Sequence, residues 1–368
     1  MSKLPITQGI KYTGSKLKLL PQILNIANEL KVETILDGFA GTTRVSQVFA
    51  KSGYEVISSD ISEWSYIFGI CYLKNKKSKQ YYEEIIKYLN SLPPKKGWFS
   101  ENYGGVVGEN GSAIQEDGTK RVWQLHNTMK LDAIREEIDN LKLDEVTKAV
   151  VLTSLILALD KVDNTLGHFT SYLKKFSPRS YQNMELKVPE IFINEKDNQV
   201  IKDDIFNVVE NIEVDLAYFD PPYGSNNEKM PPSRVRYNSY YHIWKTIILN
   251  DKPELFGKAK RRKDSSDLVS SSPFEEFRKD ENGEYLAVKA IDKLIKNTKA
   301  KYIALSYSSG GRATSEQLNQ ILNKYGKLIK IMEIDYQKNV MANMKWSNEW
   351  LRDSEAKHRE FIFVIEKN

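Results

Sequence analysis

Apolar runs of strand length alternate with segments of helical spacing in the first 60 residues of the chain. Residues 34–42 read as a short buried strand that runs into a glycine-containing turn, and residues 43–52 carry apolar side chains at helical spacing. A second apolar run, residues 55–58, leads to an acid, Asp60. Upstream, residues 17–30 have the pattern of an amphipathic helix. Because the apolar period changes from strand to helix and back, the pattern predicts a βαβ unit.

The last part of the chain shows the same alternation. Apolar residues lead into Asp220, and a polar stretch, residues 340–358, looks like the tip of a hairpin. Strands alternating with helices predict an α/β fold with a doubly wound sheet, and the late hairpin predicts that the terminal strand is reversed. The elements that we expect here are strands at 301–307 and 327–336, a helix at 315–325 and a buried terminal strand at 361–365.

The middle of the chain is dominated by helical spacing. Pro93 and Pro94 end the first of these helices. Residues 95–119 are glycine-rich and polar, which predicts a long loop. We therefore expect residues 76–185 to form an inserted, mainly helical module, with helices at 78–92, 123–141 and 144–162.

The βαβ unit favours a ligand that carries a ribose. Asp60 follows the glycine turn by about 20 residues, the spacing at which an acid can accept the hydroxyls of a ribose. Thr42 and Thr43 stand where a dinucleotide-binding turn would have further glycines, so a pyrophosphate is disfavoured. Gly38 and Gly41 could alternatively be ordinary turn glycines.

The run Asp220, Pro221, Pro222, Tyr223 ends an apolar strand and has its own chemistry. Two prolines lack N–H donors and fix φ, so the strand stops and the loop backbone is stiff. The Asp220 carboxylate and the Pro221 carbonyl could accept the two N–H bonds of a planar amine, while Tyr223 stacks on its ring. The alternative is a strand-terminating proline turn with a solvated acid.

Three motifs in one order make a specific resemblance. They are Lys-Tyr-x-Gly-Ser-Lys at residues 11–16, Asp-Gly-Phe-Ala-Gly at 37–41 and Asp-Pro-Pro-Tyr at 220–223. In this order, the chain resembles the DNA N6-adenine methyltransferases of the alpha group, the D12 class that includes the Dam-type enzymes. One departure is Thr43, at a position where the family often has glycine.

The resemblance implies a Rossmann-like methyltransferase sheet that uses S-adenosylmethionine and releases S-adenosylhomocysteine. Asp60 would hold the ribose and Asp204 the adenine, with Asp203 as the second choice for the adenine. Asp203 or Asp204 could alternatively cap the helix that begins near Ile205. Because ligands of such sheets lie outside the carboxyl ends of the strands, one crevice could hold all the strand-end acids. The implied cofactor residues are Tyr12, Lys16, Asp37, Phe39, Ala40, Gly41, Asp60, Asp203, Asp204 and Asp220, and the catalytic residues are Asp220, Pro221, Pro222 and Tyr223.

The resemblance also implies a site-specific enzyme that flips an adenine out of duplex DNA. We expect a catalytic domain of residues 1–75 and 186–368, a recognition module of 76–185, and a DNA-contacting insertion of 225–285. Candidate DNA-binding residues form two groups. The first group follows the helix at 144–162, and its residues could alternatively form only the C-cap of that helix. The second group is cationic and lies after Tyr223, and its residues could alternatively form a solvated surface. The DNA-binding candidates are Asn164, Phe169, Lys174, Lys175 and Arg179, then Arg234, Arg236, Lys260, Arg261, Arg262 and Lys263.

Composition and charge exclude some classes of protein but do not identify the function. The 368 residues carry a net charge of +5, so any nucleic-acid surface must be a local patch. The single cysteine, Cys71, excludes an intrachain disulfide and suits a reducing cytoplasm, and the four histidines show no metal-ligand spacing, so we expect no metal. No apolar run is long enough to span a membrane. Double-stranded DNA is the expected partner, with a cognate restriction endonuclease possible.

Two alternatives to this function remain open from the sequence. One is methylation of adenine in RNA or of N4 in cytosine, although cytosine enzymes usually carry Ser at the position of Asp220. The other is a non-catalytic subunit that keeps the fold and specifies a DNA site.

Overall fold

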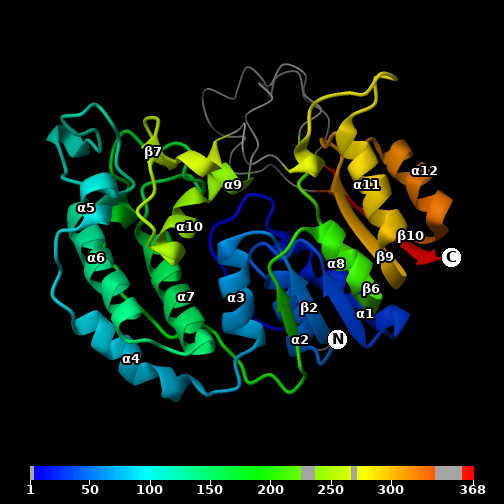
Figure 1. Ribbon diagram of the computed structural model, residues 1–368, viewed down its shortest axis with the longest axis horizontal. Helices are drawn as coiled ribbons and strands as arrows, with labels where there is room; N and C mark the ends of the chain where they lie inside the picture. The colour runs from blue at the N-terminus through cyan, green and yellow to red at the C-terminus, as the bar shows by residue number, and fades with distance from the viewer. Residues whose placement is uncertain (1–3, 225–236, 267–271, 336–358) are drawn as a thin grey trace. The chain divides into compact units, whose positions relative to one another are not determined.

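The structure is a computed structural model that describes residues 4–224, 237–266, 272–335 and 359–368. The chain is mixed α/β and divides into two compact units (Figure 1). The first unit comprises Met1–Lys31, Ala40–Lys202 and Asn238–Ser270, and the second comprises Val32–Phe39, Asp203–Tyr237 and Ser271–Asn368. The predicted domain boundaries stay a prediction.

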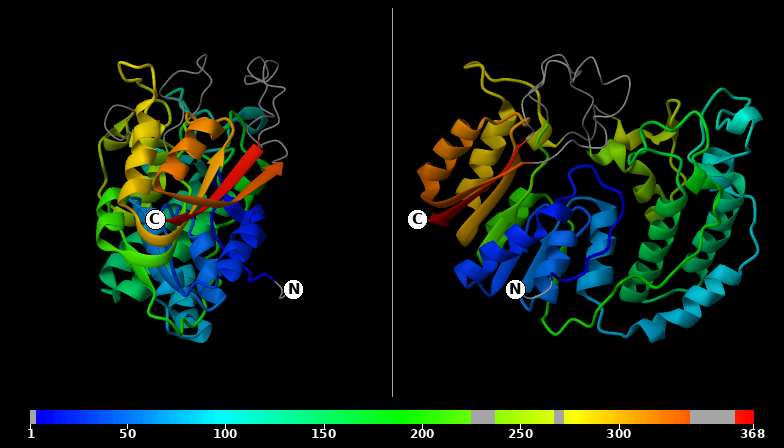
Figure 2. Two further views of the ribbon diagram at one scale, coloured as in Figure 1. Left: turned by 90° about the vertical axis from the view of Figure 1, so that its right-hand side faces the viewer. Right: turned by 180° about the vertical axis from the view of Figure 1, so that it is seen from behind.

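The second unit contains strands in the order β10, β11, β9, β6, β1. Parallel pairing joins β1 to β6 and β6 to β9. β11 runs antiparallel to β9 and β10, as a reversed terminal strand requires (Figure 2). The apolar run in β11 is buried, which fits a strand inside a sheet. The strands are β1 (Thr34–Asp37), β6 (Glu213–Phe219), β9 (Lys299–Ser308), β10 (Gly326–Asp335) and β11 (Arg359–Lys367).

Two helices of the second unit, α8 and α12, begin at a side-chain cap. α12 begins at a capping box, in which the Thr314 hydroxyl accepts the Gln317 N–H and the Gln317 side chain accepts the Thr314 N–H. α11 buries a stripe of residues from Ala287 to Ile295 and packs on α8 and α12. These helices are α8 (Ile205–Asn211), α11 (Leu286–Asn297) and α12 (Ser315–Tyr325), with a 3-10 turn η5 (Pro273–Glu275).

The first unit contains α2 and β2, the helix and second strand of the predicted βαβ unit, whose first strand is β1. β2 pairs in parallel with β5, and α2 and α3 pack beside them. With the parallel pairings of the second unit, this confirms the predicted α/β class with mainly parallel pairing. The elements are η1 (Lys16–Lys18), α1 (Leu20–Leu30), α2 (Arg44–Lys51), β2 (Glu55–Ser59), α3 (Glu63–Leu73) and β5 (Gln199–Ile201).

The rest of the first unit is mainly helical in the part that the structure describes. Figure 1 shows α6 beside α7. The elements are α4 (Lys79–Ser91), α5 (Trp98–Tyr103), β3 (Gly104–Gly105), η2 (Glu109–Gly111), β4 (Trp123–Gln124), α6 (Leu125–Asn140), α7 (Glu145–Val162), η3 (Pro178–Tyr181), α9 (Tyr237–Tyr240), α10 (His242–Leu249), β7 (Leu255–Phe256), β8 (Arg261–Arg262) and η4 (Lys263–Ser265).

The prediction of one long loop over residues 95–119 was wrong in part. Helix α5 and strand β3 lie within it. The α5 N-terminus is held by Asp132 on α6, whose carboxylate accepts the Phe99 N–H at 2.9 Å and the Ser100 N–H at 2.8 Å. A distant acid therefore supplies the cap that the local sequence lacks.

Cys71 lies on α3 and is fully buried where α3 packs against α7. Burial raises the pKa of its thiol to about 12, because the thiolate cannot be solvated there. Among the described residues, no helix combines the length and apolar content needed to cross a membrane.

Candidate functional site

The turn after β6 places two polar side chains of the predicted catalytic motif against each other. The Tyr223 hydroxyl hydrogen-bonds the Asp220 carboxylate. It also lies 2.6 Å from Oε1 of Glu360, a residue of β11 that sequence reasoning missed. Asp220 and Glu360 are 140 residues apart, so no local pattern could have paired them.

The backbone of this turn is fixed from β9 and from the residues that follow it. The Tyr223 carbonyl accepts the Arg312 N–H at 3.0 Å and the Tyr307 hydroxyl at 3.3 Å. The Tyr223 and Tyr307 rings lie 4.7 Å apart. Gly224 has a φ of +60°, a conformation that favours glycine. The turn is therefore held by its main chain as well as by its prolines.

Electrostatics keep the Tyr223 hydroxyl protonated. Burial raises the pKa of Tyr223 well above its usual value, and the neighbouring Asp220 and Glu360 carboxylates raise it further. The phenol can therefore act as a hydrogen-bond donor throughout the physiological pH range.

Behind the turn, the glycine of the Asp-Gly-Phe-Ala-Gly motif makes a close approach. A Cβ at Gly38 would lie 2.6 Å from the Phe219 ring, and the Gly38 N–H donates to the Tyr218 carbonyl at 3.0 Å. Asp37 is buried at the end of β1. The Phe39 ring lies 6.2 Å from Phe219, edge to face. Close strand packing, and not only turn formation, thus requires glycine at position 38.

Asp204 caps helix α8 in the structure. Its Oδ1 accepts the Phe206 N–H at 2.9 Å, which leaves its other oxygen open to a further donor in the described part of the chain. Asp203 is exposed and accepts the Asp204 N–H at 2.7 Å and the Asn207 side-chain amide at 3.1 Å. The capping alternative is thus observed for Asp204, and the cofactor role of either acid stays a prediction.

In the first unit, Asp60 holds the glycine turn through main-chain donors. Its Oδ2 accepts the Gly41 N–H at 2.8 Å, and its Oδ1 accepts the Ser62 N–H at 2.8 Å. Burial raises the pKa of Asp60, although the hydrogen bonds from Gly41 and Ser62 counter that shift. The Ser62 side chain and the Ile61 backbone also donate to this half-buried carboxylate, so donors from its own turn surround Asp60.

The turn itself is buried, and its glycine lies against an aromatic ring. Gly41 has a φ of +48°, and a Cβ there would touch the Tyr12 ring at 3.4 Å. The Ala40 N–H donates to the Ser59 carbonyl at 3.0 Å. A carboxylate beside a left-handed glycine and an aromatic ring suits a ribose with an attached ring, so these residues fit the predicted cofactor.

The N-terminal motif is anchored by residues that sequence reasoning did not assign. Tyr12 stacks on Tyr241, with ring centroids 4.6 Å apart, and the Thr13 N–H donates to the Tyr241 hydroxyl at 2.7 Å. The Lys11 N–H donates to Asp160 at 3.1 Å. Burial raises the pKa of Asp160 to about 7, against the opposing charge of Lys11. Lys16 is buried in the 3-10 turn before α1.

Three of the predicted DNA-binding residues are buried in the structure. Asn164 accepts the Ser177 N–H at 2.8 Å and organises the loop after α7. Phe169 is 1% exposed and packs 4.7 Å from Trp244. Arg262 is 3% exposed and pairs with two acids, Asp251 at 2.7 Å and Asp264 at 2.9 Å.

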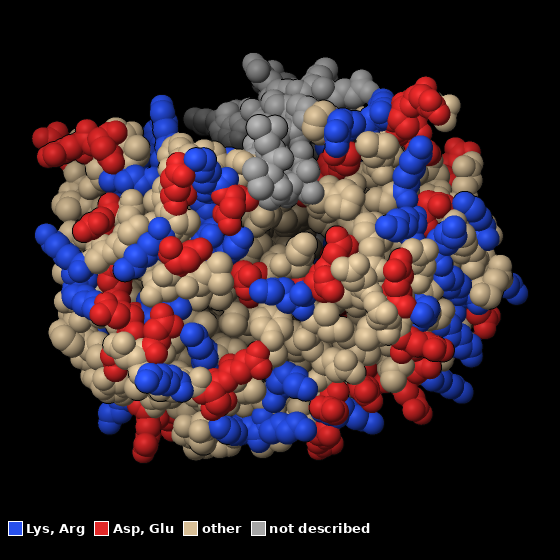
Figure 3. Space-filling model, in the orientation of Figure 1, with Lys and Arg blue, Asp and Glu red and all other residues tan. Residues whose placement is uncertain are grey.

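The other cations of that set differ in their partners. Lys174 and Lys175 are exposed. Arg179 pairs with Asp163, Lys260 with Asp117 and Lys263 with Glu254, and the Arg261 guanidinium lies over Phe256. Over the face that Figure 3 shows, Lys and Arg are interspersed with Asp and Glu. Arg234 and Arg236 lie outside the described residues.

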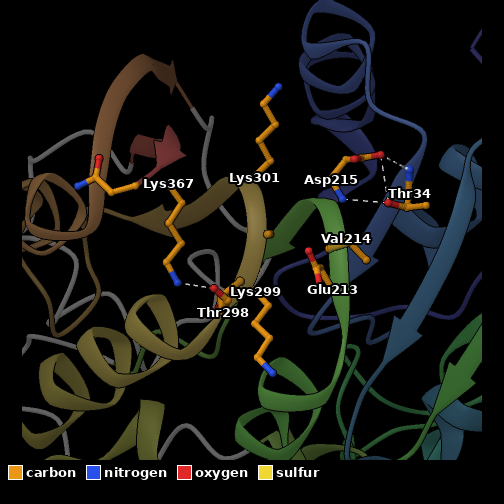
Figure 4. A pocket seen from close by; sticks show the side chains of 10 residues that line it. Thr34, Glu213, Val214, Asp215, Thr298, Lys299, Lys301 and Lys367 are labelled. Carbon is orange, nitrogen blue, oxygen red and sulfur yellow. Dashed lines mark hydrogen bonds between the residues drawn. The ribbon is translucent and has the colours of Figure 1, made fainter.

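A hollow of about 610 Å³ lies at the amino ends of the parallel strands of the second unit, away from the turn that follows β6 (Figure 4). Asp215 beside it accepts the Glu33 N–H at 2.8 Å and the Thr34 N–H at 2.9 Å. Figure 4 shows the Lys299 and Lys301 side chains extending away from each other, so they do not converge on a ligand. The lining residues are Thr34, Glu213, Val214, Asp215, Thr298, Lys299, Ala300, Lys301, Lys367 and Asn368.

Comparison with known proteins defines the family. Residues 12–308 match the D12 class N6 adenine-specific DNA methyltransferases. The chain belongs to this family, and the predicted resemblance to the D12 class is confirmed.

Similar proteins include a modification methylase and type II methyltransferases. Modification methylase StsI of Streptococcus sanguinis is 30% identical over 349 residues, which cover 92% of this chain and 50% of the relative. Type II methyltransferase M.NlaIII of Neisseria lactamica is 27% identical, with 86% of this chain and 89% of the relative covered. Type II methyltransferase M.FokI of Planomicrobium okeanokoites is 26% identical, with 98% and 53% covered. The chain thus spans about half the length of the StsI and FokI relatives.

Proposed function

We propose that this chain transfers a methyl group from S-adenosylmethionine to N6 of an adenine flipped out of duplex DNA. The observation that carries the proposal is the turn of Asp220 and Tyr223 at the carboxyl end of β6, in a chain of the D12 class. Ligands of open α/β sheets lie at this end of the strands. The hollow at the amino ends of these strands does not bring the Lys299 and Lys301 side chains together on a ligand.

Residues of the glycine turn fit the nucleoside of the methyl donor. Asp60, whose carboxylate is held in place by Gly41 and Ser62, accepts the two ribose hydroxyls in this proposal. Asp204 accepts the adenine amine with the oxygen that does not cap α8. The further cofactor residues are Tyr12, Lys16, Asp37, Phe39, Ala40, Asp203 and Asp220, and the bound donor supplies an electrophilic methyl group on sulfur.

The catalytic turn orients the target amine. Asp220 and the Pro221 carbonyl accept the two N6 hydrogens, Pro222 stiffens the loop, and Tyr223 stacks on the flipped base. Asp220 also stabilises the positive charge that develops on N6, which is the main contribution that a protein can make to a direct displacement. Stacking on Tyr223 offsets about 1–3 kcal/mol of the cost of flipping.

The DNA surface in this proposal uses the exposed cations of the first unit. The hairpin of β7 and β8 is bound to the helical segment, since the Tyr172 hydroxyl donates to the Ala259 carbonyl at 2.7 Å and Tyr103 to the Lys260 carbonyl at 2.9 Å. Residues 76–185 therefore act with part of 225–285 in recognition. Within this proposal, the buried Asn164, Phe169 and Arg262 position the surface and do not contact DNA.

Alanine at Lys174 and Lys175 tests this surface. Each lost phosphate contact lowers the log–log slope of affinity against salt by ~0.9. Lys187, which is 67% exposed and paired with Glu185, is the matched control and should leave the slope unchanged. An unchanged slope for Lys174→Ala and Lys175→Ala would remove both from the DNA surface.

The main experiment uses S-adenosylmethionine with a labelled methyl group, and offers bacterial genomic DNA and cellular RNA as alternative acceptors. We expect N6-methyladenine in the DNA digest, and none with Asp220→Ala. Label in RNA or in N4-methylcytosine would overturn the proposed substrate. Cofactor binding without transfer to any acceptor would indicate a non-catalytic specificity subunit.

Sequencing host DNA with and without expression of the chain would then give the recognised site. We place the enzyme in the cytoplasm, where its DNA substrate lies, and a cognate endonuclease is its expected genetic partner.

A further inference from the structure

Glu360 at the start of the described part of β11 contacts the predicted catalytic turn. The residue is 7% exposed. Its Oε1 lies 2.6 Å from the Tyr223 hydroxyl and accepts the Ser306 hydroxyl of β9 at 2.8 Å. A buried carboxylate costs free energy unless its hydrogen bonds are made, so this placement requires a compensating network. The family motifs of the sequence do not include Glu360.

Two carboxylates share one phenol in this network. Asp220 and Glu360 both hydrogen-bond the Tyr223 hydroxyl. A phenol has a single proton, so it donates to only one of the two acceptors at a time. The neutral state of Tyr223 is secured, because burial and both carboxylates raise its pKa. Tyr223 can therefore exchange its donor bond between Asp220 and Glu360.

The exchange matters for the proposed reaction. A target amine needs Asp220 as an acceptor, and the Tyr223 hydroxyl competes for the same carboxylate. If Asp220 were its only acceptor, release would leave the buried hydroxyl unsatisfied, which is costly. With Glu360 beside it, the hydroxyl keeps an acceptor and the ring keeps its place next to Tyr307.

We propose that Glu360 is a positioning residue of the catalytic site: it takes the Tyr223 hydroxyl when Asp220 binds the target amine. It touches neither the substrate nor the methyl donor in this role, and acts through Tyr223. Ser306 fixes the Glu360 carboxylate from the neighbouring strand β9. The inference rests on the proposed methyl transfer.

A double-mutant cycle between Glu360 and Tyr223 tests the assignment. We expect Glu360→Ala to lower kcat by about 10- to 100-fold, the value of a hydrogen bond to a charged group, with the Kd for S-adenosylmethionine unchanged. Glu360→Gln keeps an acceptor oxygen and should lose only about 3- to 10-fold, since a neutral acceptor is weaker. In a Tyr223→Phe background, Glu360→Ala should have almost no further effect on kcat.

The outcomes separate this inference from the proposed function. A wild-type chain that methylates nothing contradicts the proposed function itself. An active wild type with additive effects of Glu360→Ala and Tyr223→Phe, or with Glu360→Gln as impaired as Glu360→Ala, overturns the positioning role. Glu366 lies on the same strand but is exposed, so Glu366→Ala is the matched control and should leave kcat unchanged. If Glu360→Ala does not fold, the cycle of Glu360→Gln with Tyr223→Phe decides by the same criterion.

Discussion

Asp60 and Asp220 both follow a strand of the α/β fold, but their carboxylates are held in different ways. Asp60 accepts two main-chain N–H groups, from Gly41 and Ser62. Asp220 hydrogen-bonds a side chain, Tyr223, whose hydroxyl also reaches Glu360. One acid is fixed by the backbone of its own turn, and the other belongs to a network of side chains.

The difference matches what each acid has to do in the proposed reaction. A binding group gains from a rigid placement, because fewer degrees of freedom are lost when the ligand arrives. A group that receives a reacting amine must exchange partners during turnover, which a side-chain donor such as Tyr223 allows. The four predictions below test this contrast.

The largest effect is expected at Asp220. Replacement by Ala should lower kcat about 10³-fold, in the range of a group that acts directly on the reacting atoms. The Kd for S-adenosylmethionine should change by less than about threefold, because Asp220 acts mainly on the target amine and is only one of several proposed cofactor residues. Single-turnover methylation and calorimetry measure the two quantities. A turnover close to wild type would refute the proposed mechanism.

Asp60 should show the opposite separation. Asp60→Ala removes the acceptor for two ribose hydroxyls and should weaken S-adenosylmethionine binding by about 10- to 100-fold, as calorimetry can measure. At saturating cofactor, kcat should stay within a few-fold of wild type. Equal affinity of mutant and wild type would mean that Asp60 only holds the Gly41 turn and the start of α3.

Gly41 tests whether the backbone itself places Asp60. Gly41→Ala puts a side chain at a φ of +48° and should cost about 1–2 kcal/mol of stability. Gly53 is the matched control, since it has a φ of +91° and no atom within 4 Å of a Cβ. Both variants should unfold at lower temperature, but only Gly41→Ala should also weaken cofactor binding. Equal cofactor affinity in the two variants would contradict the placement.

Asp160 extends the comparison to an acid held by Lys11, and its effect should be the smallest. Burial raises its pKa from 3.8 to about 7, so the folded chain keeps a proton that the unfolded chain loses. This contribution to stability is full below pH 4 and is lost as the pH rises toward 7. Asp160→Asn should therefore gain melting temperature relative to wild type between pH 5 and pH 8, by about 2–4 °C.

The control for that experiment is Asp197, an acid of the same unit that is 85% exposed. Asp197→Asn removes one exposed carboxylate and so controls for the loss of a single negative charge. A pH-independent effect of Asp160→Asn would mean that its carboxylate stays ionised in the folded chain.

Elements with local signals could be predicted from the sequence. Helix α12 occupies residues 315–325 as predicted, because Thr314 and Gln317 cap each other and its apolar face has helical spacing. Helix α5 was missed, because its cap comes from Asp132, more than 30 residues along the chain. Local patterns specify an element only when its stabilising partners are also local.

The candidate site divides in the same way. Asp60 and Asp220 could be found because strand ends and proline turns are visible in the sequence. Glu360 and Tyr241 could not, since each reaches the motifs only through the tertiary fold. Asn164 and Phe169 were predicted as DNA contacts from the resemblance of their loop to the family, and Arg262 from its place in a cationic run. Neither signal determines whether a side chain is buried. The roles of all these residues stay predictions.

The buried Cys71 thiol on α3 can be used to detect local separation of α3 from α7. Cys71 is the single cysteine, and its raised pKa leaves almost no thiolate to react. A maleimide or disulfide reagent can therefore modify Cys71 only in molecules in which α3 has separated from α7. The labelling rate thus measures how often this local opening occurs. The unmodified chain thus permits a measurement of local breathing that other proteins need an engineered probe to provide.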